Sequence, residues 1–260
     1  MKILITNDDG IYAPGLWAAV EVLEDMGEVV VVAPDREQSG VGASVTLNSP
    51  VRSVEVVAPL EGIHTYAVEG TPADSVIVAL EALVQNVDLL VSGINSGFNL
   101  GEDVLVSGTV GAVLQGYFRG IPSLAVSVGS LHATDFRAAT RLLSALAHEV
   151  AEGWLPRPVL LNANLPPLAP KEIEGIDMTR LARRRYADTV RQGDDGKRKY
   201  YWITRTRPAW DMEKGTDVWS VRHRRVSLTP LQTDMTAATT LAAIEGLPER
   251  LQKLFPPVSS

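Results

Sequence analysis

Short apolar runs alternate with helix-like segments along the first two thirds of this chain. The runs are dense in Val, Ile and Leu on consecutive positions, which is typical of strands buried on both faces. Strands are predicted over residues 2–6, 28–33, 87–92, 123–128 and 159–164. Helices are predicted over residues 16–26, from Thr71 onward, over 109–118 and over 133–151. This alternation predicts an α/β fold with a doubly wound, mostly parallel sheet joined by right-handed crossovers.

The pattern changes in two places. Residues 34–66 are rich in Gly, Ser and Val, and we expect loops and a hairpin there. Beyond residue 165, strands are expected over 178–185, 200–207 and 219–228, followed by a terminal helix over 237–254. We therefore expect a core over residues 1–165, and a β-hairpin arm with a terminal helix over residues 166–260.

Composition excludes several kinds of chemistry. The 260 residues include no Cys, so neither a disulfide nor a thiol nucleophile nor a thiolate metal site can form. No apolar run approaches the roughly 20 residues of a membrane span. The N-terminus passes from Lys2 straight to two aspartates without a signal-peptide pattern, and we expect a cytoplasmic protein without membrane partners.

Charge is unevenly distributed along the chain. The net charge is −7, but residues 180–225 carry more Lys and Arg than Asp and Glu. Such a segment can contact phosphate, nucleic acid or another subunit, or it can be a solvated β-arm. It lacks the ordered aromatic and arginine pattern of single-strand binding platforms, so nucleic acid is not favoured as a partner.

Polar loops follow three of the predicted strands. They bring Asp8 and Asp9, then Ser39, then Asn95 and Asn99 to the carboxyl ends of the strands, where open α/β sheets bind ligands. An all-oxygen set suits Mg²⁺, Mn²⁺ or Ca²⁺ better than Zn²⁺. A bound cation would also keep two adjacent carboxylates ionised.

Each of these residues also has a simpler interpretation. Asp8 and Asp9 can close an Asp/Gly turn with their side chains on backbone amides. Ser39 can be an ordinary loop serine, and the two asparagines can stabilise left-handed turns.

A second polar motif, Ser107-Gly108-Thr109, stands directly before a predicted helix. Free backbone N–H groups, two hydroxyls and the positive helix end would form an anion site, although Thr109 can also be a plain N-cap. A cation site and an anion site on one sheet edge indicate a phosphate ester. The chain lacks a G-x-G-x-x-G after the first strand, a P-loop and a G-x-S-x-G, so dinucleotide binding, P-loop NTPase and serine hydrolase functions are not supported.

Five motifs together resemble the SurE family of survival-protein nucleotidases. They run in order from residue 3 to about residue 236, and they read ILITNDDGIYAPG, VVAPDREQSGVGASVT, YAVEGTPADSV, DLLVSGINSGFNLGEDVLVSGTVGAVLQG and VSLTPLQTDMT. Val106 stands where the family often has Tyr, and the VRHRRVSLTPL segment carries more Arg than expected.

The resemblance implies a Rossmann-like domain and a metal-dependent phosphatase for nucleoside 5′- and 3′-monophosphates, with polyphosphate cleavage in some members. It implies a homo-oligomer, a dimer or tetramer, in which the C-terminal hairpin takes part. One Mg²⁺ or Mn²⁺ per subunit would be held by Asp8, Asp9, Ser39 and Asn95. The phosphate would lie among Asn99, Ser107, Gly108 and Thr109, with Asp8 and Asp9 as catalytic residues.

Hydrolysis by a cation-activated water is the mechanism we expect. A covalent aspartyl-phosphate is less favoured, because Asp8 and Asp9 are adjacent rather than in the Asp-x-Asp arrangement of dehalogenase-type phosphatases. Two other functions stay open from the residues alone: a nucleotide-binding sensor or oligomer without turnover, and an RNA-binding protein that uses the basic segment 180–225. The first would bind nucleotide without releasing phosphate, and the second would bind RNA in a salt-dependent way.

Overall fold

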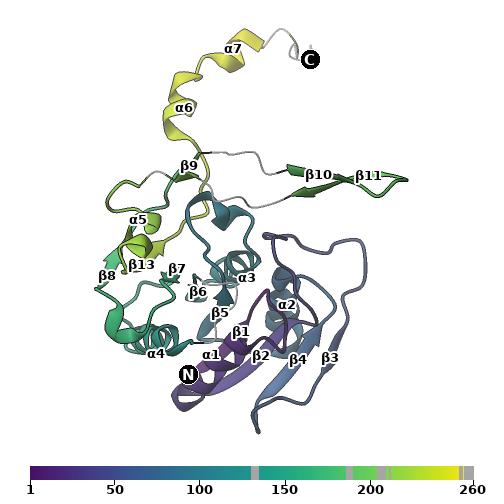
Figure 1. The fold of residues 1–260 in the computed structure, drawn as a ribbon, viewed down its shortest axis with the longest axis vertical. Coiled ribbons are helices and arrows are strands. Elements are labelled where there is room, and N and C mark those ends of the chain that lie inside the picture. Colours follow the sequence, from purple (N-terminus) through teal and green to yellow (C-terminus); the bar gives the residue numbers. More distant parts are fainter. Residues whose placement is uncertain (130–134, 186–189, 204–208, 211, 252–253, 255–260) are drawn as a thin grey trace, which may run out of the picture. The chain divides into compact units, whose positions relative to one another are not determined.

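The computed structural model describes residues 1–129, 135–185, 190–203, 209–210, 212–251 and 254. The chain forms two compact units, Met1–Pro230 and Leu231–Ser260. Figure 1 shows the order of the elements along the chain.

A mixed, mostly parallel sheet of nine strands organises the described part of the first unit. Its order is β3-β4-β2-β1-β5-β6-β7-β13-β8. The strands are β1 Lys2–Thr6, β2 Glu28–Pro34, β3 Ser53–Glu55, β4 His64–Val68, β5 Leu89–Ser96, β6 Ser123–Val128, β7 Leu160–Leu165, β8 Ile176–Met178 and β13 Val226–Pro230. Within this sheet only the β3–β4 and β7–β13 pairs are antiparallel. The predicted α/β fold with a doubly wound sheet is confirmed.

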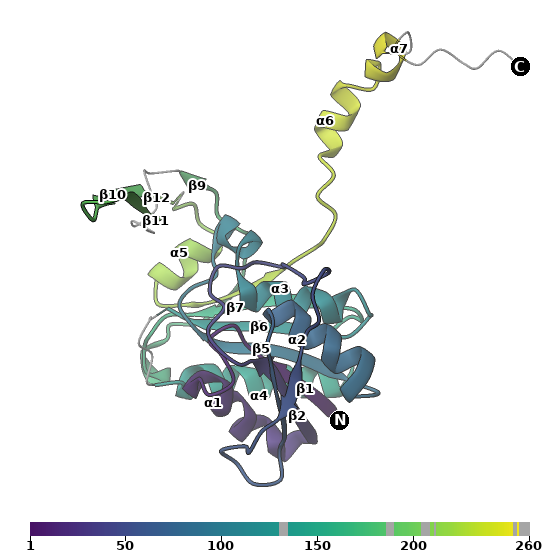
Figure 2. The same cartoon turned by 90° about the vertical axis from the view of Figure 1, so that its right-hand side faces the viewer.

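Helices cover both faces of this sheet. Figure 2 shows α1 and α4 on one face, and α2 and α3 on the other. They span α1 Pro14–Leu23, α2 Pro72–Val78, α3 Gly108–Tyr117 and α4 Arg137–Ala151, with short helical turns at Glu24–Met26, Ala79–Leu83, Gly101–Leu105 and Pro170–Glu172. Helix α2 begins as predicted: the Thr71 hydroxyl accepts from the Asp74 amide at 3.1 Å, and Pro72 takes the first helical position.

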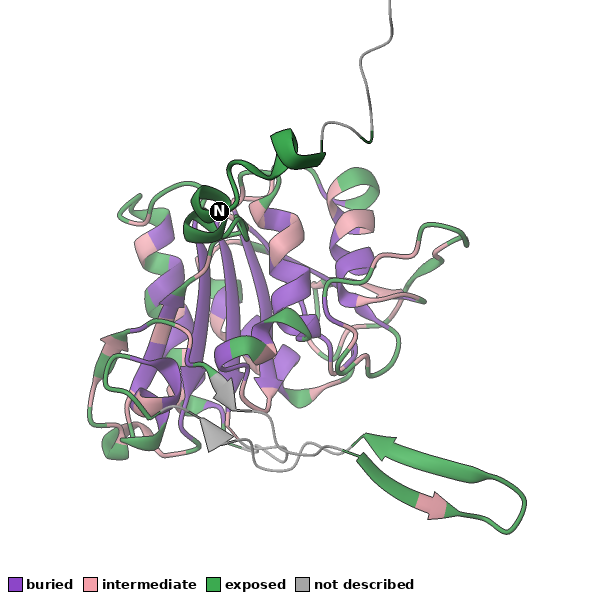
Figure 3. Ribbon diagram, turned by 90° about the horizontal axis from the view of Figure 1, so that it is seen from above, coloured by how far each residue is buried: buried purple, intermediate pink, exposed green. Residues whose placement is uncertain are grey.

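A large hydrophobic cluster lies between the sheet and helices α1 and α4. Helix α4 buries Ala139, Leu142, Leu143, Leu146, Ala147 and Val150, a spacing of three and four residues that forms one apolar stripe. Figure 3 shows that the central strands are buried along most of their length. The start of the predicted helix at residues 133–134 lies outside the described residues.

The region around Trp219 differs from its predicted structure. Residues 219–228 were expected to be a strand, whereas Asp217–Arg222 forms helix α5 and only Val226–Pro230 is a strand. The helix forms because the Thr216 hydroxyl accepts from the Trp219 amide at 3.2 Å and caps its N-terminus. Asp217, fully buried, accepts from the backbone N–H groups of Gly101 at 2.7 Å and Ala182 at 2.9 Å.

Strand β13 lies late in the chain but belongs to the main sheet. It pairs with β7, Ser227 opposite Asn164, and so extends the main sheet. The first compact unit, Met1–Pro230, includes this strand.

An antiparallel hairpin is present in the basic segment, as predicted. It joins β10 Val190–Asp194 to β11 Lys199–Ile203, and the Asp195 carboxylate accepts from two amides of its turn. The expected strand 178–185 is replaced by the end of β8 and by β9 Arg184–Arg185, which pairs with β12 Ala209–Trp210. Residues 204–207 of the predicted second strand lie outside the described residues.

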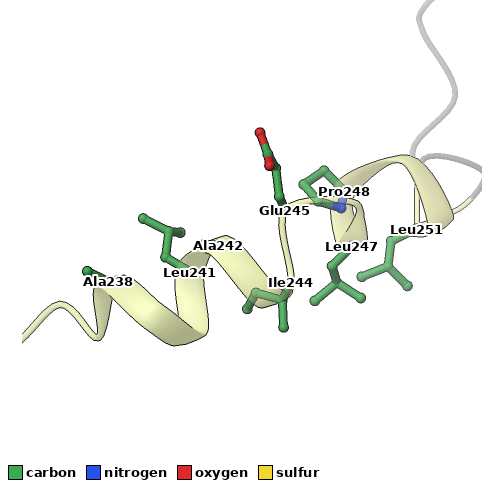
Figure 4. A pocket seen from close by; sticks show the side chains of 8 residues that line it. All are labelled: Ala238, Leu241, Ala242, Ile244, Glu245, Leu247, Pro248 and Leu251. Atoms are coloured by element: carbon green, nitrogen blue, oxygen red, sulfur yellow. The ribbon is translucent and has the colours of Figure 1, made fainter.

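Over its described residues, the second unit contains two short helices instead of one long helix. They are α6 Ala238–Ala243 and α7 Leu247–Leu251, separated by a break that includes Gly246. Figure 4 shows Ile244, Leu247 and Leu251 pointing to one side of this segment, and all three are exposed. Residues 252–253 of the predicted helix lie outside the described residues. Among the described helices, none has the length and apolarity to cross a membrane.

Candidate functional site

The candidate site lies where the direction of the sheet order reverses. Strand β1 has β2 on one side and β5 on the other, so Asp8 and Asp9 follow β1 at a topological switch point. Asn7 closes the turn after β1: its side-chain amide donates to the Gly10 carbonyl at 2.9 Å and accepts from the Gly10 amide at 3.2 Å. The side chain that closes the turn is therefore that of Asn7, and the carboxylates of Asp8 and Asp9 make other contacts.

Asp8 is buried, with 5% of its surface exposed. Its Oδ1 accepts a hydrogen bond from the Thr109 hydroxyl at 2.8 Å. Burial raises the pKa of Asp8 from 3.8 to about 6, although the bond from Thr109 acts in the opposite direction. Ionisation of Asp8 at neutral pH therefore lowers the stability of the folded protein.

Asp9 is half-buried and contacts a different element. Its Oδ2 accepts from the Ser96 amide at the end of β5, at 3.1 Å. Burial raises the pKa of Asp9 as well, and the negative charge of Glu37 adds to this effect. The two carboxylates thus face the ends of different elements, Asp8 toward α3 and Asp9 toward β5.

The loop after β2 closes over this edge of the sheet. The Gln38 amide donates to the Asp8 carbonyl at 2.7 Å, and the Gly42 amide donates to the Val106 carbonyl at 3.0 Å. Gly111 permits the second contact, because a Cβ there would lie 2.4 Å from the Gly42 oxygen. Ser39 lies on this loop, but its side chain is exposed and donates to Glu37 at 2.7 Å.

The N-terminus of α3 meets the Asp8 side chain directly. Ser107 is the N-cap, since its hydroxyl accepts from the Val110 amide at 3.2 Å, and the helix begins at Gly108. Thr109 is therefore not the cap, and its hydroxyl is free to bind Asp8. A Cβ on Gly108 would lie 2.8 Å from the Asp8 Cβ, so only glycine allows this close approach.

Asn95 and Asn99 are both buried, but their surroundings differ. Asn95 donates from Nδ2 to the Gly97 carbonyl at 2.9 Å. Asn99 donates from Nδ2 to the Thr109 hydroxyl at 3.1 Å and to the Ser127 hydroxyl at 2.9 Å. Direct contacts thus join Asp8, Thr109 and Asn99, while Asn95 precedes the Ser96 amide that binds Asp9.

The oxygen atoms at this edge fit a hard divalent cation. Within the described residues, the side-chain and backbone groups that bind these carboxylates are neutral: the Thr109 hydroxyl donates to Asp8 Oδ1, and the Ser96 amide donates to Asp9 Oδ2. The described chain also offers no cluster of three or more His, Cys, Asp and Glu for a metal. Two carboxylates with neutral oxygens beside them are the ligands that Mg²⁺ and Mn²⁺ prefer.

Sequence reasoning missed the polar residues beneath the site. Ser127, Asn162 and Asn164 lie on β6 and β7, are fully buried, and form hydrogen bonds with Asn99. The available signal was the LNANL run, in which amide side chains alternate with apolar ones in a buried strand.

Comparison with known proteins decides the family. The family model described as Survival protein SurE matches residues 3–188. The chain belongs to the SurE family. A relative from Dehalococcoides mccartyi, named 5′-nucleotidase SurE, is 44% identical over 234 residues, which cover 89% of this chain and 88% of the relative. A second relative from Thermus thermophilus, named 5′-nucleotidase SurE 1, is 46% identical and covers 96% of this chain and 98% of its own.

A solved SurE structure has the same fold. The crystal structure of the SurE protein from Aquifex aeolicus superposes with a TM-score of 0.79 at 36% identity, and it covers 95% of this chain and 99% of its own. The resemblance drawn from the sequence motifs is therefore confirmed for the family and for the fold.

Proposed function

We propose that this SurE-family chain is a 5′-nucleotidase, a phosphomonoester hydrolase that removes phosphate from nucleoside 5′-monophosphates. The names of its relatives support this activity. The observation that carries the proposal is the contact between Asp8 and Thr109, which brings a carboxylate against the polar N-terminus of α3. We extend the proposal to 3′-monophosphates and to one Mg²⁺ or Mn²⁺ per subunit, with polyphosphate cleavage as a side activity.

Asp8, Asp9 and Asn95 would hold the cation, and Ser39 would join them by turning its hydroxyl away from Glu37. When bound, the cation neutralises phosphate charge and makes a water molecule acidic enough to react near neutral pH. The amides at the start of α3 would bind the non-bridging oxygens as their charge changes in the transition state, and Thr109 and Asn99 would lie beside them. Asp8 or Asp9 would orient the attacking water and take its proton.

A nucleotide and metal panel tests this function. Phosphate release is measured on 5′- and 3′-nucleoside monophosphates and on polyphosphate, with Mg²⁺, with Mn²⁺ and with excess chelator. We expect release from 5′-monophosphates only when a cation is supplied. Release that persists in chelator would contradict the metal requirement. A nucleotide-dependent rise in Tm without any release would instead indicate a sensor.

Replacing Thr109 with valine is expected to weaken phosphate binding more than cation binding. Valine keeps the shape of the side chain but removes the hydroxyl that donates to Asp8 at 2.8 Å. We expect KM for AMP to rise by about 10-fold or more, while the affinity for Mn²⁺, measured by calorimetry, changes less. Thr109→Ser keeps the hydroxyl and serves as the control. Unchanged kcat and KM in Thr109→Val would remove Thr109 from the site.

We also propose that the chain works as a homo-oligomer, a dimer or a tetramer, in the cytoplasm. Exposed Leu241, Ile244, Leu247 and Leu251 in the second unit support an association surface, because contiguous exposed apolar side chains mark contact sites.

A further inference from the structure

Strand β7 carries two amide side chains into the interior of the protein. Asn162 and Asn164 are both fully buried. Their neighbours Leu161, Ala163 and Leu165 pack in the core with α1 and α4, so the two asparagines lie on the opposite face, toward α3. A buried amide is costly unless its polar atoms are hydrogen-bonded, and such a pair in a central strand requires a reason.

Both asparagines bind the backbone of one residue, Asn99. Asn164 accepts from the Asn99 amide at 2.9 Å and donates to the Asn99 carbonyl at 3.0 Å. Asn162 donates to the same carbonyl at 2.8 Å. The backbone N–H and C=O of Asn99 are thus both paired with side chains that come more than sixty residues later in the chain. Side chains of β7 therefore satisfy both backbone polar groups of this loop residue.

The side chain of Asn99 transfers this fixed position to the site. Its Nδ2 uses both protons, one toward Thr109 Oγ1 at 3.1 Å and one toward Ser127 Oγ at 2.9 Å. Because Thr109 Oγ1 accepts from Asn99, its own proton points to Asp8 Oδ1, 2.8 Å away. The orientation of the Thr109 hydroxyl therefore depends on where Asn99 is held.

In the part of the chain that the structure describes, the side chain of Asn162 also has one polar atom without a hydrogen-bond partner. Within the described residues its buried Oδ1 has no hydrogen-bond partner. An unpaired buried carbonyl lowers stability, whereas a leucine of similar shape would leave no such atom. The hydrogen bond that an amide provides at this position is the one to the Asn99 carbonyl.

We propose that Asn162 and Asn164 are positioning residues for phosphoester hydrolysis. They hold Asn99, which keeps the Thr109 hydroxyl directed at Asp8, and neither asparagine touches the reacting atoms. The proposal rests on the nucleotidase function proposed above and extends it to a second layer of residues on β7.

The test compares Asn162→Leu and Asn164→Leu with Thr179→Val. Thr179 is buried in the same sheet region, and its hydroxyl pairs with Ser227 at 2.8 Å and Thr229 at 2.7 Å, away from Asn99. The measurements are kcat and KM for AMP with Mn²⁺, Tm, and hydrogen exchange of the Asn99 amide by NMR. We expect kcat to fall about 10- to 100-fold in both leucine variants, with faster Asn99 exchange in Asn164→Leu. Asn162→Leu should lose more activity than its change in Tm accounts for, and Thr179→Val should keep its kcat within about 2-fold.

A double-mutant cycle separates positioning from general damage. If Asn164 acts through Asn99, then Asn164→Leu should lower kcat little further in an Asn99→Ala background, because coupled residues are not additive. If the two substitutions lowered kcat by independent factors that multiply, the proposal would be overturned. An unchanged kcat in both leucine variants would also overturn it, and so would an unchanged exchange rate of the Asn99 amide in Asn164→Leu. A wild-type chain that releases no phosphate from any nucleotide would overturn the nucleotidase function alone, since Asn99 exchange still reports whether β7 holds that residue.

Discussion

Replacing Asp8 with asparagine is expected to abolish phosphate release from AMP while making the metal-free protein more stable at neutral pH. Asparagine keeps an oxygen that can accept from Thr109, whose hydroxyl lies 2.8 Å from Asp8 in the wild type. It removes the negative charge that would hold the cation and the proton acceptor for the water. We expect kcat to fall by about three orders of magnitude or more, measured by phosphate release with Mn²⁺.

The gain in stability follows from the raised pKa of Asp8. Burial raises this pKa from 3.8 to about 6, so the folded protein binds the proton more tightly than the unfolded chain does. The stability of the folded state therefore decreases as pH rises from about 4 to about 6, and the full cost is present at neutral pH. This shift corresponds to a cost on the order of 2–3 kcal/mol, which Asp8→Asn removes. Tm in chelator should rise at neutral pH and change little near pH 4.

A matched control for this substitution is Asp25→Asn, because Asp25 is exposed. It should leave both kcat and the pH dependence of Tm unchanged. If Asp8→Asn kept wild-type activity, Asp8 would be excluded from catalysis. If the Tm of Asp8→Asn fell at neutral pH, the buried charge of Asp8 would not destabilise the folded protein as the raised pKa indicates.

Replacing Gly108 with alanine is expected to cause the second-largest loss of activity. The added Cβ would lie 2.8 Å from the Asp8 Cβ and 2.9 Å from its Oδ2, so the carboxylate or the start of α3 must move. A displacement of about 1 Å at a reacting group can lower kcat by about 100-fold. Overpacking costs about 1–3 kcal/mol, but alanine also favours the helix over glycine by up to about 1 kcal/mol. The loss of kcat should therefore be larger than the loss of stability suggests.

Gly246→Ala is the control for this second substitution, since no heavy atom lies within 4 Å of a Cβ built there. The comparison uses kcat and KM for AMP, the affinity for Mn²⁺, and Tm. Equal kcat in Gly108→Ala and wild type would show that Asp8 does not need its present position. A loss confined to Tm would show that Gly108 serves packing alone.

The strands and helices of the core could be predicted because their signals are local. Runs of Val, Ile and Leu predict β1, β2 and β6 close to their observed bounds, and Thr71 with Pro72 predicts the start of α2. The region after residue 165 was harder because tertiary contacts decide it. The residues of α5 are apolar enough for a strand, but the Thr216 cap and the buried Asp217 favour a helix.

The part of the candidate site that lies at the carboxyl ends of strands could be predicted from the sequence. The topology alone brings Asp8, Asp9 and Asn95 to one edge, and the SGT motif gave the start of α3. The sequence could not show that Ser107 rather than Thr109 is the cap, because both hydroxyls can accept from a backbone amide. Nor could it show that Asn162 and Asn164 bind Asn99, since that contact spans more than sixty residues.

The late position of β13 in the chain has a consequence for synthesis on the ribosome. Strand β7 needs β13 as its neighbour, and β13 begins only at Val226. Until that segment leaves the exit tunnel, β7 is an open edge that can pair with other chains. The same strand anchors the loop that carries Asn99. A nascent chain that stalls before Val226 should therefore expose this edge of β7 and be prone to aggregation.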